Sequence, residues 1–442
     1  MTIVARTAKA VTDLFSVHVQ AAAASSGVIK RLRKFDASSL LRTMVLGFLQ
    51  KPNASDEHLA QVAAQCGVSV TPQAIARRHT QKLVDFLETI FRKAVQTVIG
   101  ADRALAPILE RFTEVTLLDS SGIPLPDSLS KLFPGCGGTH GGGKAALKLQ
   151  TELDLRSSAL THVSIEAGRT SDGGSERQQA KRPVGSLRIA DLGYFSVGVF
   201  VSLVAAGSHF LSRLHFKTGV RLSGQDKTVD LLAWLAQQPG PWIDVAIQLG
   251  PERLACRMIA WKLPEDRAAE RRRKLRQTIK QRSGNEPSAL RLAWCDWTIL
   301  VTSVPAELLT PTESAVLYRA RWQIELLFKR WKSQNLIATR SGSSEIRQMV
   351  RIWARLLVSI IQHWFIVTAT NGDPDRSWNK VAEAIRAFVC RFAAAGLCIH
   401  EWEKILHDLQ RVVATTCKRN PRTKPGTAEL LNDPSRLEFR LS

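Results

Sequence analysis

Four polar residues with complementary chemistry are spaced along one predicted helix. The segment LYRARWQIELLFKRWKS, residues 317–333, contains Tyr318, Arg321, Glu325 and Lys332. At about 100° per residue these side chains share a strip roughly 60° wide, and apolar residues fill the adjoining sector. The guanidinium, the ammonium and the phenol could hold phosphate groups, and the carboxylate could hold a metal ion. The alternative is a structural Glu–Arg pair four residues apart, which leaves Tyr318 and Lys332 unexplained.

The spacing Y-x2-R-x3-E-x6-K resembles the signature of DDE transposases of the insertion-sequence-four type, and the similarity extends over YRARWQIELLFKRWKS. The resemblance covers roughly residues 110–370. It implies an α/β fold in which a ribonuclease-H-like catalytic core is interrupted by a β-rich insertion. It also implies a first catalytic aspartate at the end of the first core strand, similar to Asp119 in EVTLLDSS. The second, similar to Asp191 in ADLGYF, follows the fourth strand.

The resemblance therefore implies three catalytic carboxylates, Asp119, Asp191 and Glu325. Taken alone, Asp119 would be interpreted as a turn or cap residue. Two Mg²⁺ or Mn²⁺ ions about 3.5–4 Å apart could activate water and stabilise the leaving oxygen. Such hard cations prefer oxygen ligands, and they offset the repulsion within an acidic cluster. Asp127, after a proline-rich turn, and Asp154, inside a strand, are interpreted as structural.

The reaction implied by the resemblance is metal-dependent cleavage at the terminal inverted repeats of a mobile element. The exposed 3′-hydroxyl would then attack target DNA, with no covalent protein–DNA intermediate, in a homodimer assembled on double-stranded DNA ends. Related enzymes form a DNA hairpin and stack a displaced base on tryptophan, for which Trp294 and Trp297 are the candidates. Core packing of these two rings is the alternative.

The charge of the chain supports a polyanionic partner. It has 61 Lys and Arg against 39 Asp and Glu, a net charge of +22 and a pI near 10.2. The longest uncharged stretch, Leu192 to Ser208, is shorter than the ~20 residues of a membrane span and is predicted to be a buried helix and turn. Seven scattered cysteines without a CxxC pair are typical of a reducing compartment. We therefore expect a cytoplasmic, nucleoid-associated protein without membrane contact.

Apolar spacing predicts helices over residues 1–105, strands and helices in the middle, and helices again over 311–417. The division into domains that we predict has five ranges: a helical DNA-binding domain 1–108, a first core part 109–205, a β-rich insertion 206–290, a second core part 291–370 and a helical C-terminal region 371–442.

Two basic elements are candidates for contact with DNA. Near residues 55–79, two short helices around Gly67 resemble a helix-turn-helix. The second would present Gln73, Arg77, Arg78 and His79, and a helical hairpin with a solvated basic face is the alternative.

The other basic element is a predicted helix at 264–288. It includes Arg272 and Arg273 among eight basic residues and could follow a phosphate backbone, unless it is a solvated surface helix.

A glycine-rich segment at 138–144, GTHGGGK, fits the spacing of a phosphate-binding loop. Ala145 follows where the motif needs a hydroxyl, and a strand pattern follows where it needs a helix. We interpret the segment as a loop.

The leading prediction is an active transposase that performs DNA cleavage and strand transfer by a cut-and-paste route. A transposase-derived DNA-binding protein without catalysis, and a nuclease without strand transfer, are the alternatives. Three clustered carboxylates favour an enzyme, because DNA binding alone does not use them.

Overall fold

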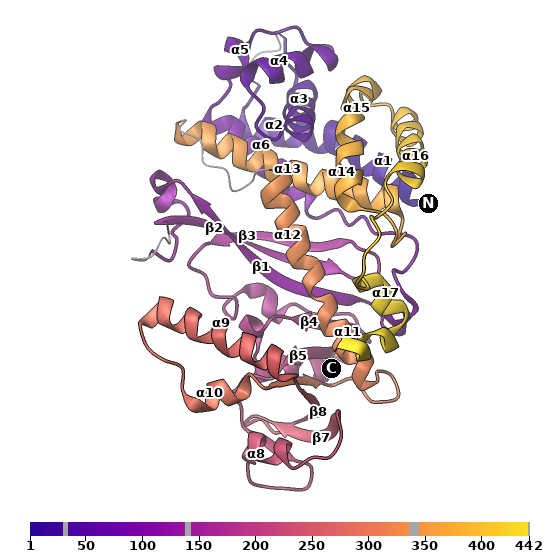
Figure 1. Cartoon of the computed structure of the whole chain (residues 1–442). Coiled ribbons are helices and arrows are strands. Elements are labelled where there is room, and N and C mark those ends of the chain that lie inside the picture. Colours follow the sequence, from indigo (N-terminus) through magenta and orange to yellow (C-terminus); the bar gives the residue numbers. More distant parts are fainter. Residues whose placement is uncertain (30–33, 138–142, 336–343, 441–442) are drawn as a thin grey trace. The chain divides into compact units, whose positions relative to one another are not determined.

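The computed structural model describes residues 1–29, 34–137, 143–335 and 344–440 (Figure 1). The chain folds into two compact units. The helical unit contains Met1–Leu105, Ser120–Thr170 and Ile324–Pro421, and the sheet unit contains Ala106–Asp119, Ser171–Gln323 and Arg422–Ser442. Each unit is described by itself.

The helical unit confirms the predicted helical ends of the chain. Its helices are α1 (Ile3–Asp13), a π-helix (Leu14–His18), α2 (Val19–Ser26), α3 (Ala37–Gln50), α4 (Asp56–Gln65), α5 (Pro72–Ala76), α6 (Gln81–Ala94), most of α12 (Trp322–Gln334), α13 (Glu345–Thr370), α14 (Trp378–Ala387), α15 (Val389–Ala395) and α16 (Ile399–Thr416).

The long helix α13 forms the core of this unit. α3, α6, α14 and α16 pack against it (Figure 1). The rings of Phe365, Phe392 and Trp402 stack there. Its length and apolar composition would also suit a membrane span, but that apolar stretch is entirely buried, which identifies a core helix.

A buried histidine in α13 makes the stability of the protein sensitive to acid. His363 donates from Nε2 to the carbonyl of Ser158, 2.8 Å away, and packs edge-on against Trp378. Burial lowers the pKa of His363 from 6.5 to about 4. Between these two pH values the unfolded chain binds more protons than the folded chain, so stability is complete above pH 6.5 and falls as the pH decreases toward 4.

We expect His363→Gln to weaken this pH dependence, because glutamine can still donate to Ser158 but does not titrate. Between pH 7.5 and pH 5, the wild type should lose about 2 kcal/mol more unfolding free energy than the variant. Urea unfolding at both pH values measures the difference. Equal losses in the two proteins would show that His363 is not the titrating group.

The helical unit also contains a β-hairpin. β2 (Ala145–Asp154) pairs antiparallel with β3 (Leu160–Ala167). β2 also neighbours β1 (Val115–Leu125), whose residues from Ser120 onward belong to this unit. We expected the first core strand to end at Asp119, and this is wrong. The strand continues because Ile123 and Leu125 alternate inward and remain buried, which is the pattern of a strand with one covered face.

The sheet unit confirms a mixed α/β fold. Its strand order is β1-β4-β5-β9-β8-β7-β6. The members after β1 are β4 (Leu187–Ala190), β5 (His209–Arg213), β9 (Trp297–Thr302), β8 (Leu254–Lys262), β7 (Ile243–Leu249) and β6 (Val220–Leu222). β1, β4 and β5 are parallel, and the pairs from β5–β9 onward are antiparallel.

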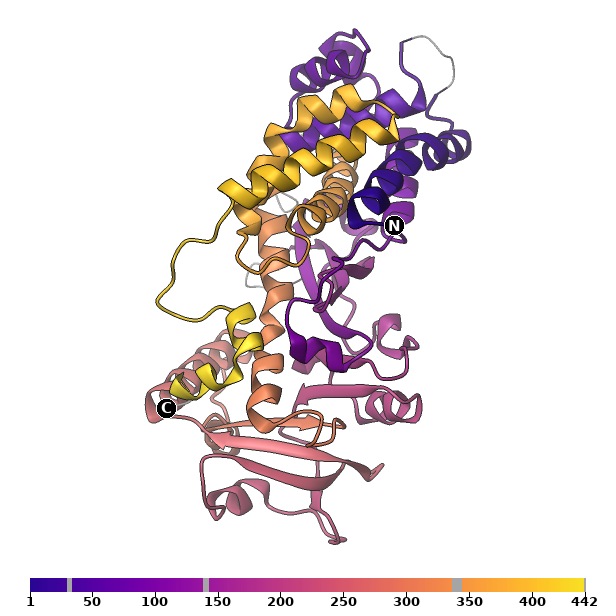
Figure 2. The same ribbon diagram turned by 90° about the vertical axis from the view of Figure 1, so that its right-hand side faces the viewer.

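Helices of the sheet unit are α7 (Val197–Ala205), α8 (Leu231–Ala236), α9 (Glu265–Ser283), α10 (Ala289–Trp294), α11 (Pro311–Ala320) and α17 (Thr427–Asn432). α17 packs against α11 (Figure 2). The predicted buried helix within 192–208 is α7, but it is only half covered. Phe200 and Leu203 are buried, whereas Val201 and Val204 are more than a third exposed, since one side alone packs on the sheet.

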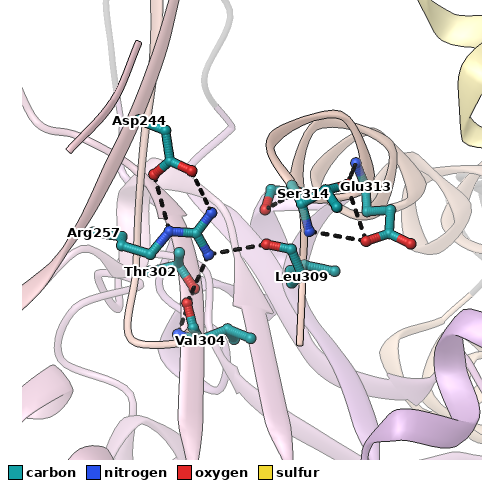
Figure 3. A network of polar contacts seen from close by, with 8 residues as sticks. Asp244, Arg257, Thr302, Val304, Leu309, Glu313 and Ser314 are labelled. Carbon is teal, nitrogen blue, oxygen red and sulfur yellow. Dashed lines mark hydrogen bonds and ion pairs between the residues drawn. The ribbon is translucent and has the colours of Figure 1, made fainter. Parts of the chain in front are cut away.

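A polar network fixes the segment between β9 and α11 (Figure 3). The Arg257 guanidinium on β8 binds both carboxylate oxygens of Asp244 on β7, at 2.9 and 2.7 Å. Its third nitrogen donates to the carbonyls of Val304 and Leu309, each at 2.9 Å. This charge-assisted network holds the connection that leads into α11.

The first turn of α11 is closed by a capping box. Thr310 Oγ1 accepts from the backbone of Glu313, and the Glu313 carboxylate accepts from the backbone of Thr310. Glu313 also pairs with Arg111, 2.8 Å away. The helix that carries Tyr318 therefore begins at a fixed place on the sheet.

Candidate active site

Two of the predicted catalytic carboxylates lie side by side at one edge of the parallel strands. Leu118 is opposite Ala190, and Ile189 is opposite Leu211. The next residues along each strand are therefore Asp119 and Asp191, in the same row as Arg213 on β5. Side chains in one row of a parallel sheet point to the same face. The strand register thus places two acidic side chains and one basic side chain in the same row.

Local packing explains the Asp-x-Gly-aromatic pattern around Asp191. Tyr194 is buried against Leu118 and Ala190, the residues that precede the two aspartates. A Cβ at Gly193 would lie 2.8 Å from a carboxylate oxygen of Asp172, so only glycine fits without a shift. The buried aromatic ring holds the turn after β4 against the sheet.

Arg321 connects the two aspartates. Its Nη1 lies 3.4 Å from Oδ2 of Asp119, and its Nη2 lies 3.7 Å from Oδ1 of Asp191. The side chains of Arg321 and Asp119 are about one-seventh exposed, whereas Asp191 is 47% exposed. One guanidinium therefore spans both carboxylates at the rim of the sheet.

The helix predicted over 317–333 is divided at Arg321. α11 ends at Ala320 and α12 begins at Trp322. The backbone N–H of Arg321 bonds to the carbonyl of Tyr318, three residues back, at 3.2 Å. This shorter step tightens the helix at the residue that contacts the aspartates.

The Tyr318 hydroxyl is buried among charged groups. Burial, together with the charge of Asp191, raises the pKa of Tyr318 to about 12, although Arg213 and Arg321 oppose the shift. The phenol therefore remains protonated at neutral pH and can donate a hydrogen bond. Arg271 of α9 belongs to the same group, because burial and the charge of Arg213 lower its pKa to about 10.

Sequence reasoning missed Arg213 and Arg271. Neither residue belongs to a motif. The position of Arg213 beside the aspartates follows only from the register of three strands. The predicted strands did contain a signal, since residues at the carboxyl ends of parallel strands gather at one edge of a sheet. Arg271 was counted among the basic residues of its helix, but it is half-buried and donates to the carbonyl of Trp297 at 3.2 Å.

Glu325 and Lys332 lie on the part of α12 that belongs to the helical unit. Both side chains are half-buried, and burial lowers the pKa of Lys332. The buried face of α12 is formed by Ile324, Leu327, Phe328 and Trp331, as the apolar sector predicted. The structure thus brings together Asp119, Asp191, Tyr318 and Arg321 in one unit, and it describes Glu325 and Lys332 in the other.

The donor set suits a hard divalent cation. Asp119 and Asp191 offer carboxylate oxygens close enough to share one guanidinium, and such oxygens are the ligands preferred by Mg²⁺ and Mn²⁺. Within the described parts of the chain, no group of three or more His, Cys, Asp or Glu side chains is gathered tightly enough to hold a metal ion. Among the predicted carboxylates, the sheet unit itself supplies the pair of aspartates.

The two candidate stacking residues pack against the sheet. Trp294 and Trp297 are half-buried and contact the apolar cluster formed by β5, β7, β8 and β9. By contrast, Trp322 is 55% exposed and directly follows Arg321. The sequence does not distinguish Trp322 from the other tryptophans, because its exposure depends on the packing of the helix.

α9 confirms the predicted basic helix, and its arginines are divided between two roles. Arg272 pairs with Glu265 and with Asp296, whereas Arg273 is exposed. Arg276 and Lys280 follow on the exposed part of the helix. Arg273, Arg276 and Lys280 therefore carry exposed positive charge on α9, whereas Lys274 pairs with Glu270.

The helix-turn-helix candidate is present as two helices, α4 and α5. Ser55 caps α4, Thr71 caps α5, and Gly67 takes a left-handed backbone conformation with φ of 84°. The second helix is shorter than expected and ends at Ala76. Gln73 and Arg77 are exposed on it.

Two further residues of this hairpin are not presented to solvent as predicted. The Arg78 guanidinium lies over the Phe35 ring, 4.8 Å from its centre. His79 is tied to Asp56 at 3.0 Å, with its side chain 6% exposed. Both residues follow the end of α5, where the chain turns back toward the unit.

The residues interpreted as structural behave as such. Asp154 accepts hydrogen bonds from the backbone of Arg156 and Ser157, and Asp127 accepts one from the backbone of Lys144. In the glycine-rich segment, residues 138–142 lie outside the described residues. The strand β2 begins at Ala145, so no helix follows the segment as a phosphate-binding loop requires.

Comparison with known proteins gives consistent matches. The family of the transposase DDE domain matches residues 110–361. The transposase for insertion sequence element IS231B of Bacillus thuringiensis subsp. berliner is 28% identical over 359 residues, which cover 76% of this chain and 74% of that protein. The transposase for IS231E of Bacillus thuringiensis subsp. finitimus is 29% identical over 354 residues, covering 74% and 73%. The transposase for IS1151 of Clostridium perfringens is 26% identical over 365 residues, covering 75% and 74%. These matches confirm the resemblance drawn from the Y-R-E-K spacing.

Proposed function

The chain belongs to the family of transposases with a DDE domain, and we propose that it is an active enzyme of that family. It would bind the terminal inverted repeats of an insertion sequence, cut them in a metal-dependent reaction and join the 3′ ends to target DNA. The work would be done by a homodimer on paired ends, in the cytoplasm at the nucleoid. The catalytic core would be ribonuclease-H-like. The whole chain would be divided into the five predicted domains.

The observation that carries this proposal is the pair of aspartates bridged by Arg321. Asp119 and Asp191 follow one another across two parallel strands, and the bridging arginine is part of the Y-R-E-K set. Three parallel strands followed by an antiparallel extension support the proposed core.

In the proposed mechanism, Asp119, Asp191 and Glu325 would hold two Mg²⁺ or Mn²⁺ ions. Metal held there would supply Lewis-acid chemistry to the attacking and the leaving oxygen. Arg321 and Lys332 bind phosphate oxygens beside the cleaved bond, and the protonated Tyr318 hydroxyl donates a further hydrogen bond. Arg213 supports this arrangement by adding positive charge in the row of the aspartates.

Recognition of the DNA would rest on two basic elements. Gln73 and Arg77 are exposed on the hairpin and would read an element end, with Arg78 supporting their helix from its position over Phe35. On α9, Arg273 would contact the phosphate backbone, and Arg272 would hold the helix in place through Glu265 and Asp296.

Stacking on a displaced base can be assigned by fluorescence. We expect 2-aminopurine at the end of the element to be quenched by an aromatic ring in the cleavage complex. Alanine variants of Trp294, Trp297 and Trp322 should differ, and the exposed Trp322 should be the one whose loss restores fluorescence. Quenching that survives all three substitutions would remove a stacking tryptophan from the mechanism.

A strand-transfer assay tests the proposed function. The substrate is DNA that flanks the gene of this chain, incubated with the protein, Mg²⁺ or Mn²⁺ and a target plasmid. Insertions that carry the same end sequence in every product support a transposase. Metal-dependent cuts without insertions would indicate the nuclease alternative, and specific binding without cuts would indicate a DNA-binding protein.

A further inference from the structure

A second group of positive charges lies beside the hairpin in the helical unit. Asp56, the first residue of α4, contacts one basic side chain with each carboxylate oxygen. Oδ1 lies 3.0 Å from Nε2 of His79, and Oδ2 lies 3.1 Å from Nη1 of Arg347 on α13. The segment that follows α5 and the start of α13 are therefore joined through one carboxylate of α4.

The positive charge at this place exceeds the charge of Asp56. Arg351 follows Arg347 by one turn of α13, and both arginines lower the pKa of His79, for which burial is the largest cause. Burial and the charge of Arg347 also lower the pKa of Arg351, while Asp56 raises it. With His79 neutral, Asp56 faces two guanidiniums, and a net positive charge remains.

The two arginines are at the surface, whereas the next arginine of the same helix face is not. The Arg347 side chain is 30% exposed, and Arg351 is half-buried. Arg355, one turn further, donates to the carbonyl of Pro52 at 2.7 Å and lies over the Phe48 ring. Arg355 is therefore part of the packing, while Arg347 and Arg351 can meet a ligand.

We propose that Arg347 and Arg351 extend the DNA-binding surface of the hairpin by contacting phosphates of the duplex on which α5 rests. This inference depends on the proposed function, since it assumes that the hairpin binds DNA. Residues four apart on a helix are about 6 Å apart at Cβ, a spacing that suits neighbouring phosphates of one strand. Asp56 holds Arg347 in place and competes with the phosphates for it.

The test measures binding to duplex DNA from the flank of the gene at several salt concentrations. Arg347→Gln with Arg351→Gln should make the slope of log affinity against log salt shallower by about 2, since each phosphate contact adds about 0.9. Restoring the charges with Arg347→Lys and Arg351→Lys should restore most of the slope. Asp56→Asn should act in the opposite direction and tighten binding, which loss of folding would not do.

A similar arrangement elsewhere in the helical unit provides the control. Arg391 and Arg411 both bind Asp408, so their glutamine variants remove two arginines from one aspartate in the same way. For these control variants, the slope of log affinity against log salt should equal that of the wild type. If the Arg347 and Arg351 variants also keep the wild-type slope while Arg77→Gln weakens binding, the inference is wrong and the proposed function stands. If the wild type binds no flanking sequence specifically, the proposed function fails, and the inference fails with it.

Discussion

Replacing Asp119 or Asp191 by asparagine should reduce metal-dependent DNA cleavage by at least about 10³-fold while binding to the element ends is unchanged. The amide is nearly the same size as the carboxylate, so the row across β1 and β4 should be kept. It carries no charge, however, and is a weaker ligand for Mg²⁺ and Mn²⁺. Cleavage rates and end binding, measured on the same DNA, separate the two effects.

Asp127→Asn is the matched control for these variants. Asp127 accepts a hydrogen bond from the backbone of Lys144, and asparagine can accept it too. This variant should cleave at the wild-type rate. Cleavage that persists in both Asp119→Asn and Asp191→Asn would mean that the catalytic carboxylates lie elsewhere in the chain.

Arg321→Ala should reduce cleavage by about 10²-fold, and Arg321→Lys should recover only part of the loss. The guanidinium reaches Asp119 and Asp191 with two different nitrogens, and a single ammonium cannot reproduce that fork. Without Arg321, two neighbouring carboxylates also lose a compensating charge, so the affinity of the site for Mn²⁺ should change as well. Single-turnover cleavage over a range of Mn²⁺ concentrations measures both effects.

The neighbouring Arg319 is the control for general loss of positive charge. It lies on the exposed side of α11, two residues before Arg321. Arg319→Ala should stay within about twofold of the wild-type cleavage rate. An equal loss in both variants would assign the effect to net charge and not to the bridge between the aspartates.

The sequence was most informative where chemistry and local spacing coincide. Tyr318, Arg321 and Glu325 could be chosen as candidates without a structure, because their spacing resembles a known signature. The apolar residues beside them predicted the buried face of α12. The alternation of Leu147, Leu149 and Leu153 likewise predicted β2. In both cases the signal is local, and a few neighbouring residues carry it.

Features that depend on distant pairing were not predictable. β1 runs past Asp119 to Leu125 and lies between β4 and β2 in the sheet, and neither neighbour can be identified from EVTLLDSS alone. The role of Arg213 depends on the register of β5 against β4. Arg78 was expected to be exposed and instead stacks on Phe35, 43 residues earlier in the chain.

We propose that Glu325 acts in catalysis together with the two aspartates. The most direct test incubates flanking DNA with Mg²⁺ or Mn²⁺ and either the wild type or Glu325→Gln, and maps the breaks at nucleotide resolution. We expect breaks at discrete element ends that need metal and are absent with the variant, although the variant still binds those ends. Equal cleavage by the two proteins would contradict this proposal.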